Sequence, residues 1–339
     1  MRVRLATPAD ASGIQALLRQ PQGAEWKIAT TYEPDLAAGL LCLGQATTVV
    51  VEDDHGVAAC GVRAVRDVWW QGAPSRLGYL ALLRCAPQVS PWHRVRLLGG
   101  CLRLLRAQRQ PDELSWDLTA IMAGNATAMR LFTRGLRDLP TYRPIADFVV
   151  HVISPARYAG KPSPDVRPAQ VADLTQIAAL LAPLAGEALL SRPLVADPAG
   201  WWVATDAGMT VATAFFCDVR HLRQVIVHAF PPSIQWLQWP ISVVRRLAGY
   251  TPLPRLGTVV AQVTIDHVRG SASGRQRLIV ALAHHARQSG ATHVAIGGAA
   301  GFSSERADVF QAQWFAVEDH APELNSWPKG VFDQAVASL

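Results

Sequence analysis

An internal repeat limits the folds open to this chain of 339 residues more than any other feature. Segment 3–10 ends in Asp10 and is followed by apolar residues at 14, 17 and 18. Segment 166–173 ends in Asp173, and apolar residues follow at 177, 180 and 181, so the matching positions keep a constant offset of 163. Each copy predicts a short strand, an Asp near a helix N-terminus and an apolar helical stripe. We therefore expect a duplicated domain.

A proline-rich stretch separates the two copies. Residues 155–164 hold three prolines and a glycine, a composition typical of a stiff linker. We therefore predict an N-terminal domain at 1–155, a linker at 156–164 and a C-terminal domain at 165–339. At this length each domain can bury a core of its own.

The composition is that of a globular protein, with 50% hydrophobic and 17% charged residues. Apolar runs are too short for a membrane span, since even 37–51 is interrupted by Gln and Thr. The N-terminus does not have the basic and apolar regions of a secretory signal. We expect a cytoplasmic protein.

Cysteine spacing and charge exclude several classes of function. The five cysteines are scattered and form no Cys-x-x-Cys pair, which favours buried free thiols over disulfides or a zinc site. The formal charge of +6 comes almost wholly from arginine, with no long basic run and no aromatic-basic motif. Nucleic acid is therefore disfavoured as a partner, and an acidic, phosphate-bearing ligand fits better.

Hydrophobic periodicity predicts a similar order of elements in both halves, and hence an α/β (α+β) class with a mixed central sheet flanked by helices. In the first half we expect strands at 48–52, 57–65, 77–85, 114–122 and 146–153, and helices at 94–109 and 125–136. In the second half we expect strands at 201–205, 210–217, 259–265 and 293–296, and helices at 273–288 and 304–313.

One strand-to-helix turn in the second half has the composition of a phosphate-binding loop. It consists of Arg269, Gly270, Ser271, Ala272, Ser273 and Gly274. Small residues let backbone N–H groups approach a ligand, and a helix N-terminus behind them favours an anion such as pyrophosphate. A tight turn without a ligand is the alternative.

This turn resembles the acetyl-CoA motif of GCN5-related N-acetyltransferases (GNAT), Arg/Gln-x-x-Gly-x-Gly/Ala, with Ala272 at the first small position. In the first half, segment 96–101 is similar, keeping Arg96, Gly99 and Gly100 but ending in Cys101. The family's next motif begins with Asn on a helix beside CoA. Segment 125–136, which starts at Asn125, is similar to it, and segment 304–315 is a looser match.

The resemblance implies two tandem GNAT-like domains with acetyl-CoA as co-substrate. It implies that the residues of the turn at 269–274, together with Arg96, Gly99, Gly100 and Asn125, contact the donor. The closer match to the family's acetyl-CoA turn lies in the second half, and the closer match to its flanking helix lies in the first. We therefore expect one working donor site, slightly favouring the second half, with the other half shaping the acceptor cleft.

The catalytic groups are less clear from the resemblance. Many family members use a Tyr as general acid, but the matching positions are Phe132 and Gln311, which cannot donate a proton in this way. Candidates for a base are Tyr79, Asp266 and His267. Because neighbouring strand residues point to opposite faces, at most one of Asp266 and His267 is expected to face the site. The alternative is that they are ordinary polar residues at a strand end.

No metal site is predicted. Consecutive histidines occur at 284 and 285 in a predicted helix. Neighbouring helical residues diverge by about 100°, so these two cannot chelate jointly as an i, i+4 pair does.

The second half carries an insertion, 230–250, that is rich in tryptophan and contains two consecutive arginines. Our first interpretation is packing across the interface between the halves or against a second subunit. The alternative is peripheral contact with a membrane surface, or binding of an acyl chain.

The expected function is acyl-CoA-dependent N-acyl transfer, with acetyl transfer to a small-molecule or peptide amine in first place. One alternative is a binding or regulatory protein whose sites have decayed, because fold alone does not settle activity. Another is an aminoacyl or long-chain acyl transferase, supported by the tryptophan-rich insertion. The identity of the acceptor and the oligomeric state stay open.

Overall fold

A computed structural model describes residues 1–23, 26–136, 139–158, 162–191, 197–297, 307–318 and 331–332. The first half contains β1 (Arg2–Leu5), α1 (Ala11–Leu18), β2 (Lys27–Thr31), α2 (Leu36–Leu41), β3 (Gln45–Asp53), β4 (Gly56–Trp70), β5 (Ala73–Cys85), α3 (Pro91–Arg106), β6 (Glu113–Met122), α4 (Ala126–Thr133) and β7 (Thr141–Ile153). The second half contains β8 (Val166–Pro168), α5 (Leu174–Glu187), β9 (Ala188–Ser191), β10 (Trp201–Asp206), β11 (Met209–Cys217), β12 (Gln224–Ala229), α6 (Pro232–Gln235), α7 (Gln238–Leu247), β13 (Gln262–Gly270), α8 (Ala272–Gln288), β14 (His293–Gly297), β15 (Asp308–Glu318) and β16 (Val331–Phe332).

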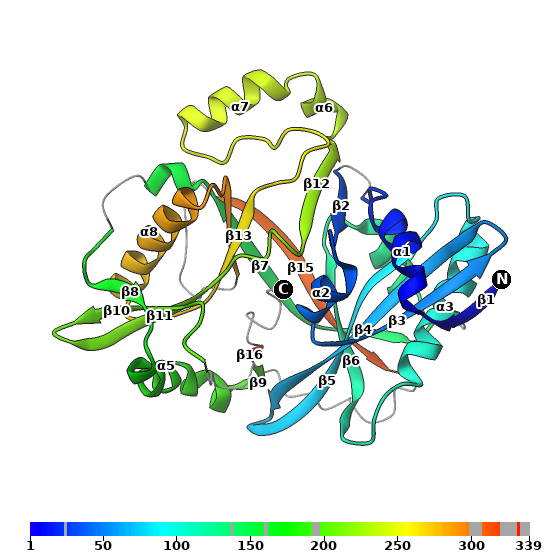
Figure 1. Ribbon diagram of the computed structural model, residues 1–339, viewed down its shortest axis with the longest axis horizontal. Helices are drawn as coiled ribbons and strands as arrows, with labels where there is room; N and C mark the ends of the chain where they lie inside the picture. Colours follow the sequence, from blue (N-terminus) through cyan, green and yellow to red (C-terminus); the bar gives the residue numbers. More distant parts are fainter. Residues whose placement is uncertain are drawn as a thin grey trace.

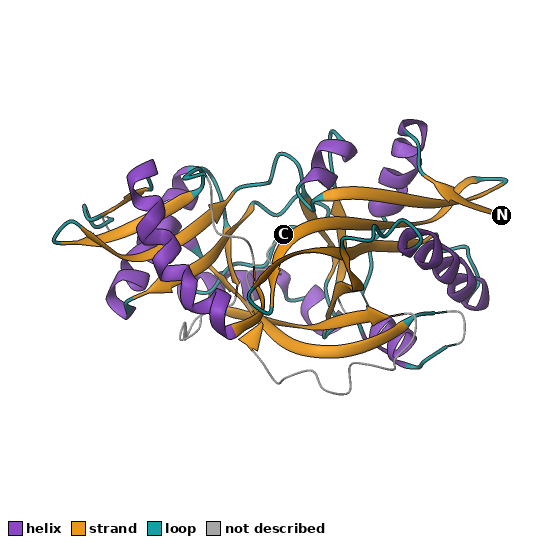
Figure 2. Cartoon of the chain, turned by 90° about the horizontal axis from the view of Figure 1, so that it is seen from below, coloured by secondary structure: helices purple, strands orange, loops and turns teal. Residues whose placement is uncertain are grey.

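One mixed sheet runs through both halves (Figure 1). Its main order is β1-β3-β4-β5-β6-β15-β7-β14-β13-β11-β10-β8, while β9 pairs with β4 and β16. A separate two-stranded sheet joins β2 of the first half to β12 of the second. Helices flank the sheet on both sides (Figure 2). The predicted fold class, a mixed sheet flanked by helices, is confirmed.

The two halves exchange their last long strands. Strand β15 of the second half pairs with β6 of the first, and β7 of the first half pairs with β14 of the second. Between them β7 and β15 pair antiparallel, from Val152 opposite Asp308 to Thr141 opposite Glu318. Each half therefore depends on the other to complete its part of the sheet.

The repeated segments make equivalent ion pairs. Arg4 binds both carboxylate oxygens of Asp10 at 2.7 and 2.8 Å, and Arg167 binds those of Asp173 at 2.6 and 2.9 Å. Each Asp also accepts a backbone N–H from three residues earlier, at 2.7 Å in both halves. The bound guanidinium holds the pKa of both carboxyls below the usual range. The offset of 163 therefore corresponds to matching local structure.

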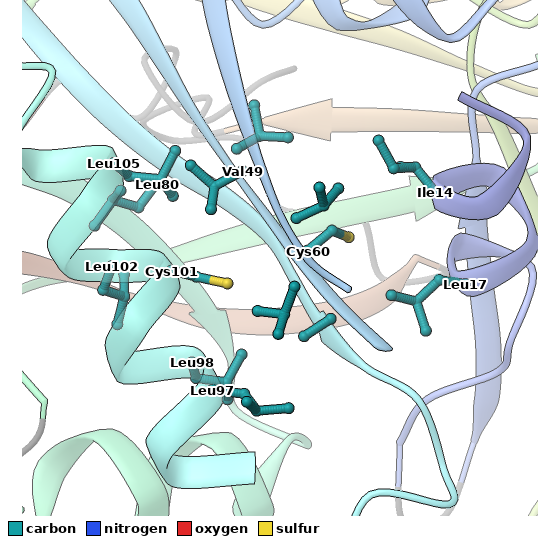
Figure 3. Packing of buried hydrophobic residues seen from close by; sticks show 14 of the residues in the cluster. Ile14, Leu17, Val49, Cys60, Leu80, Leu97, Leu98, Cys101, Leu102 and Leu105 are labelled. Atoms are coloured by element: carbon teal, nitrogen blue, oxygen red, sulfur yellow. The ribbon is translucent and has the colours of Figure 1, made fainter. Parts of the chain in front are cut away.

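Leucine spacing on α3 explains the core of the first half. Leu98, Cys101, Leu102 and Leu105 recur on one helical face and pack on the sheet with Cys60 of β4 (Figure 3). Each fully buried Leu contributes roughly 2 kcal/mol relative to an exposed one. In the second half α8 packs on β13 and β14 in the same way, through a cluster that includes Leu278, Ile279, Leu282, Ile265 and Val294.

Most predicted elements are confirmed, but two are not. Residues 308–313, expected within a helix at 304–313, belong to strand β15, and 304–306 lie outside the described residues. Pairing to β6 and β7 on both sides outweighs any helical tendency there. The strand expected at 259–265 is β13 at Gln262–Gly270, so it reaches further into the turn than predicted.

The cysteines form no disulfide: Cys60 and Cys101 are buried, while Cys42, Cys85 and Cys217 are partly buried. Burial raises the pKa of the Cys60 thiol to about 12 and that of Cys85 to about 11, which keeps both protonated and unreactive near neutral pH. Among the described residues, the helices are all too short or too polar to cross a membrane.

Candidate functional site

In the second half, the described ladder between two parallel strands ends in the middle of the sheet. Strands β13 and β14 pair from Gln262 opposite His293 to Ile265 opposite Ile296, and no further. Beyond Ile265, β13 continues to Gly270, and among the described residues, which follow β14 only to Gly297, it pairs there with β11. The backbone N–H and C=O groups of residues 266–270 that point towards β14 therefore lie beyond the last residue pair of this described ladder.

The first half has the same arrangement. Strands β5 and β6 pair up to Tyr79 opposite Leu118, and the Thr119 hydroxyl then donates to the carbonyl of Leu80 at 2.9 Å. From there β5 continues to Cys85 without pairing to β6. The first half thus has a V-shaped opening between two described strands, and in the second half the parallel ladder ends at the corresponding place, at Ile265.

A β-bulge lies just beyond each of these places. In β5 the bulge contains Leu82 with φ 52°, and in β13 it contains His267 with φ 51°. Non-glycine residues seldom adopt this left-handed conformation, and such strain is often found at functional sites. The shared bulge marks these two places as candidate sites, and no sequence signal had indicated it.

The bulge also changes the expected orientation of Asp266 and His267. Asp266 is directly opposite Phe215, so the two share a face of the sheet, and Phe215 packs on Trp201 at 5.4 Å. The His267 ring also lies 5.4 Å from Trp201. The alternation behind the expectation that at most one would face the site does not hold here, because the extra residue of the bulge interrupts it. Both side chains are buried on one face, with 1% and 6% exposure.

Helix α8 begins immediately after β13. Its first turn is small and open, since Ser271, Ala272 and Ser273 are exposed. The Ser271 hydroxyl accepts the Gly274 N–H at 3.2 Å and so caps the helix. The N–H groups of Ala272 and Ser273 precede the first turn of helical hydrogen bonds, and the helix dipole makes this end positive. Arg269 lies just before this turn at the end of β13.

The two glycines of this turn have a packing role. Gly270 has φ 106°, and a Cβ there would come within 2.2 Å of the Val211 carbonyl oxygen. A Cβ on Gly274 would lie 2.7 Å from that of Ala212. They let α8 start directly against β11, which accounts for the glycines whether or not a ligand binds.

In the first half the segment that resembles this turn is helical. Arg96, Gly99 and Gly100 lie inside helix α3, which already begins at Pro91. A Cβ on Gly100 would lie 3.1 Å from the Val3 side chain, so this glycine packs on β1. Segment 96–101 therefore lies in the helix predicted at 94–109, and it resembles the turn at 269–274 in sequence but not in structure.

The actual N-terminus of α3 is less suited to an anion than that of α8. Its first residue, Pro91, has no N–H, and the second, Trp92, is bulky and 87% exposed. Arg94 donates to the carbonyls of Val89 and Pro87 at 2.8 and 2.7 Å. This arginine holds the preceding loop in place.

The predicted motif helix of the first half is α4. Asn125 is its N-cap and accepts the Ala128 N–H at 3.1 Å. Phe132 is buried and stacks on Tyr142 at 4.5 Å. In the second half, Gln311 is in strand β15 opposite Val149, so the match assumed for segment 304–315 is wrong from 308 onwards.

The other predicted residues lie elsewhere. Tyr79 is in the first half, with the Arg66 guanidinium 4.5 Å above its ring and Trp314 at 6.3 Å. His284 and His285 diverge: His284 contacts Gln288 at 3.0 Å, while the His285 ring lies 5.1 Å from that of Trp202. Within the described part of the chain, no group of three or more His, Cys, Asp or Glu could hold a metal ion.

Comparisons with solved structures agree with this architecture. Two structures of Saccharomyces cerevisiae N-myristoyltransferase with bound myristoyl-CoA match with TM-scores of 0.54 and 0.55 at 9% and 8% identity. The matches cover 98% and 99% of this chain and 87% and 83% of those chains. A GCN5-related N-acetyltransferase from Anabaena variabilis matches with a TM-score of 0.48 at 12% identity, over 93% of this chain and 72% of that one.

No protein-family model matches the chain, and neither does any curated protein sequence. The structural matches lie well below the identity at which function transfers, so they speak for the fold. The chain has the GNAT fold, as its motifs predicted.

Proposed function

We propose that this protein is an acyl-CoA-dependent N-acyltransferase, with acetyl-CoA as donor and an amine as acceptor. The observation that carries the proposal is the combination found in the second half. The end of the described parallel ladder at Ile265, a left-handed bulge at His267 and an exposed helix N-terminus of small residues follow one another within ten residues. This is a suitable place for a thioester beside a pyrophosphate.

The proposed donor site uses the turn from Arg269 to Gly274. Phosphate oxygens would accept from the N–H groups of Ala272 and Ser273, with Arg269 supplying positive charge. The first half would have the weaker site, because Pro91 lacks an N–H at the equivalent position. We propose that the first half serves mainly to shape the acceptor cleft, and the donor contacts expected for Arg96, Gly99, Gly100 and Asn125 stay a prediction.

This division belongs with our proposed domain organisation: tandem GNAT-like domains at 1–155 and 165–339, joined by the linker at 156–164. Matching ion pairs at Arg4 and Arg167 and matching bulges at Leu82 and His267 support the duplication.

The reaction needs few groups. The acceptor amine attacks the thioester carbonyl, a C–N bond forms, the C–S bond breaks, and CoA leaves as the thiolate. Asp266 and His267 lie on one face of β13 and are our candidates for taking the amine proton, directly or through water. Backbone groups of β13 beyond Ile265 would orient the carbonyl, so positioning supplies much of the rate. Tyr79, in the other half, is the less favoured candidate.

A longer acyl donor is the second candidate. The matches with TM-scores above 0.5 are N-myristoyltransferases with bound myristoyl-CoA. This likeness supports a fatty acyl donor as the alternative to acetyl-CoA. The residues of the protein proposed above would keep the same roles with either donor.

The proposal is tested by measuring both acyl transfer, through release of the CoA thiol, and binding of CoA. The intact protein is incubated with acetyl-CoA or myristoyl-CoA and a panel of small amines and peptides, and free CoA thiol and acylated amine are measured. Acetyl transfer supports the first candidate, and transfer only from myristoyl-CoA supports the second. Calorimetric binding of CoA without transfer would favour a binding or regulatory protein. Absence of both binding and transfer would refute the proposal.

A further inference from the structure

The insertion at 230–250 projects from the body of the protein. Helices α6 and α7 lie beyond the end of the sheet, joined to it by β12 and the loop before β13 (Figure 1). Phe230 is buried and packs edge-on against Trp26 at 5.1 Å, so the segment begins at the interface between the halves. From 231 to 250, however, no residue is buried. The expectation that the segment packs between the halves therefore holds only at its start.

Helix α7 has the reverse of the usual orientation for a surface helix. Two of its polar residues face the protein: Gln238 donates to the Pro254 carbonyl at 3.2 Å, and Arg245 donates to that of Thr251 at 2.8 Å. Arg245 also forms an ion pair with Asp308 of β15. These contacts fix the rotation of α7 about its axis.

Most of the large apolar residues of α7 consequently face outwards. Trp239, Val243 and Leu247 recur every four residues and form one stripe, with 77%, 39% and 83% exposure. Trp236, at 90%, and Val244, at 64%, widen it. Exposed apolar surface gathered in this way on one element marks an interaction site.

The surroundings of the stripe are basic. Residues 219–265, between Asp218 and Asp266, contain five arginines and no Asp or Glu. Two of these five arginines, Arg220 and Arg245, pair with Asp218 and Asp308. Arg246 and Arg255 of this stretch are exposed. The favoured partner is therefore anionic.

We propose that the α6–α7 hairpin, residues 231–250, docks on an anionic lipid surface. Tryptophan at the headgroup level, an apolar stripe below it and arginines at the border are the features of a helix that lies in a membrane interface. A two-fold contact with a second copy would instead place the arginines of both copies together, which is electrostatically unfavourable. The proposal does not depend on the acyl-transfer proposal.

The experiment is vesicle flotation of the full-length protein. Vesicles of phosphatidylcholine alone are compared with an equimolar mixture of phosphatidylcholine and phosphatidylglycerol, at low and high salt. The protein is expected to float with the anionic vesicles, and less so at high salt. The double variant Trp236→Ser, Trp239→Ser should bind the anionic vesicles at least about tenfold more weakly, because two exposed rings no longer enter the interface.

Trp92→Ser is the matched control, since Trp92 is equally exposed but lies on α3. It should bind like the parent protein, whereas Arg246→Glu should weaken binding to the anionic vesicles alone. Trp236 and Trp239 are both exposed, so the double variant should keep the fold of the parent protein. Circular dichroism checks this. Failure of the parent protein to float, or equal loss with Trp92→Ser, would overturn the proposal. The proposal would also be overturned if the parent protein bound no vesicles but sedimented as a dimer, and the double variant sedimented as a monomer.

Discussion

Leu82 and His267 occupy the same place in the two halves of the sheet, and both hold the left-handed backbone conformation, with φ 52° and 51°. Each lies in a β-bulge of the strand that continues past the end of the described parallel ladder. Since one residue is a leucine and the other a histidine, the bulge belongs to the strand geometry and not to a particular side chain. What distinguishes the halves is the chemistry at the bulge, and only the second carries an imidazole with a carboxylate next to it.

His267→Gly separates the backbone from the imidazole. Glycine adopts positive φ without strain, so the bulge should persist, although losing the packing of the buried ring on Trp201 should lower the melting temperature. If His267 handles the amine proton, kcat should fall by about 100-fold. Steady-state rates of thiol release measure this effect. Leu82→Gly makes the same backbone change in the first half and should leave kcat within about threefold; an equal loss there would contradict our choice of the second half.

Ser273→Glu tests where the pyrophosphate binds. Ser273 is the second residue of α8, and Trp92 is the second residue of α3. A carboxylate in the first turn of a helix is stabilising, so neither Ser273→Glu nor Trp92→Glu should unfold its half. At the donor site the new charge repels the phosphates and should raise the KM for acyl-CoA by about tenfold or more.

Titration calorimetry and the dependence of the rate on acyl-CoA measure that change. Trp92→Glu should leave the KM for acyl-CoA nearly unaltered. A larger effect of Trp92→Glu than of Ser273→Glu would move the donor site to the first half.

Local pattern was enough to predict much of the fold. The hairpin at 201–217 and the helix observed from Ala272 to Gln288 follow from periodicity and turn residues within a short window. The ion pairs of Arg4 and Arg167 correspond to the repeat that suggested a duplicated domain. These features depend on residues close together in the chain.

The exchange of β7 and β15 could not be predicted, because pairing partners more than 150 residues apart leave no local trace. For the same reason residues 308–313 were expected to be helical, although they pair on both sides in the sheet. The orientation of Asp266 and His267 depends on a bulge without glycine, and sequence alternation cannot reveal it. Sequence thus identified the turn at 269–274 but misjudged the residues just before it.

A buried ion cluster in the first half predicts a large stability effect. Asp117, with no exposed side-chain surface, accepts from Arg63 and Arg109 at 2.8 Å each. Asp117→Asn removes the charge that compensates these guanidinium groups and should cost about 3 kcal/mol of unfolding free energy. Asp112→Asn is the control: Asp112 pairs with Arg76 at 2.7 Å but is 60% exposed, so solvent screens the pair and its loss should change the unfolding free energy far less. Urea denaturation measures both, and equal effects would show that burial does not strengthen the cluster.

His293 predicts how stability depends on pH. It is buried at the start of β14, with Nδ1 2.8 Å from the Thr292 hydroxyl oxygen, and burial lowers its pKa to about 4 although nearby Asp308 acts in the opposite direction. The unfolded chain has the ordinary histidine pKa of about 6.5. Between pH ~6.5 and ~4 the unfolded state therefore binds a proton that the folded state does not, and stability falls as the pH falls through this window.

This contribution is fully present above pH ~6.5 and amounts to about 3 kcal/mol lost by pH ~4. His293→Gln keeps a polar group beside Thr292 but cannot titrate, so its unfolding free energy should fall less steeply over this range. Urea denaturation at several pH values gives the difference between the two proteins. Burial also lowers the pKa of His151, but this histidine is present in both and cancels in the difference. Parallel pH dependences for the parent protein and His293→Gln would show that His293 is not held neutral by burial in the folded state.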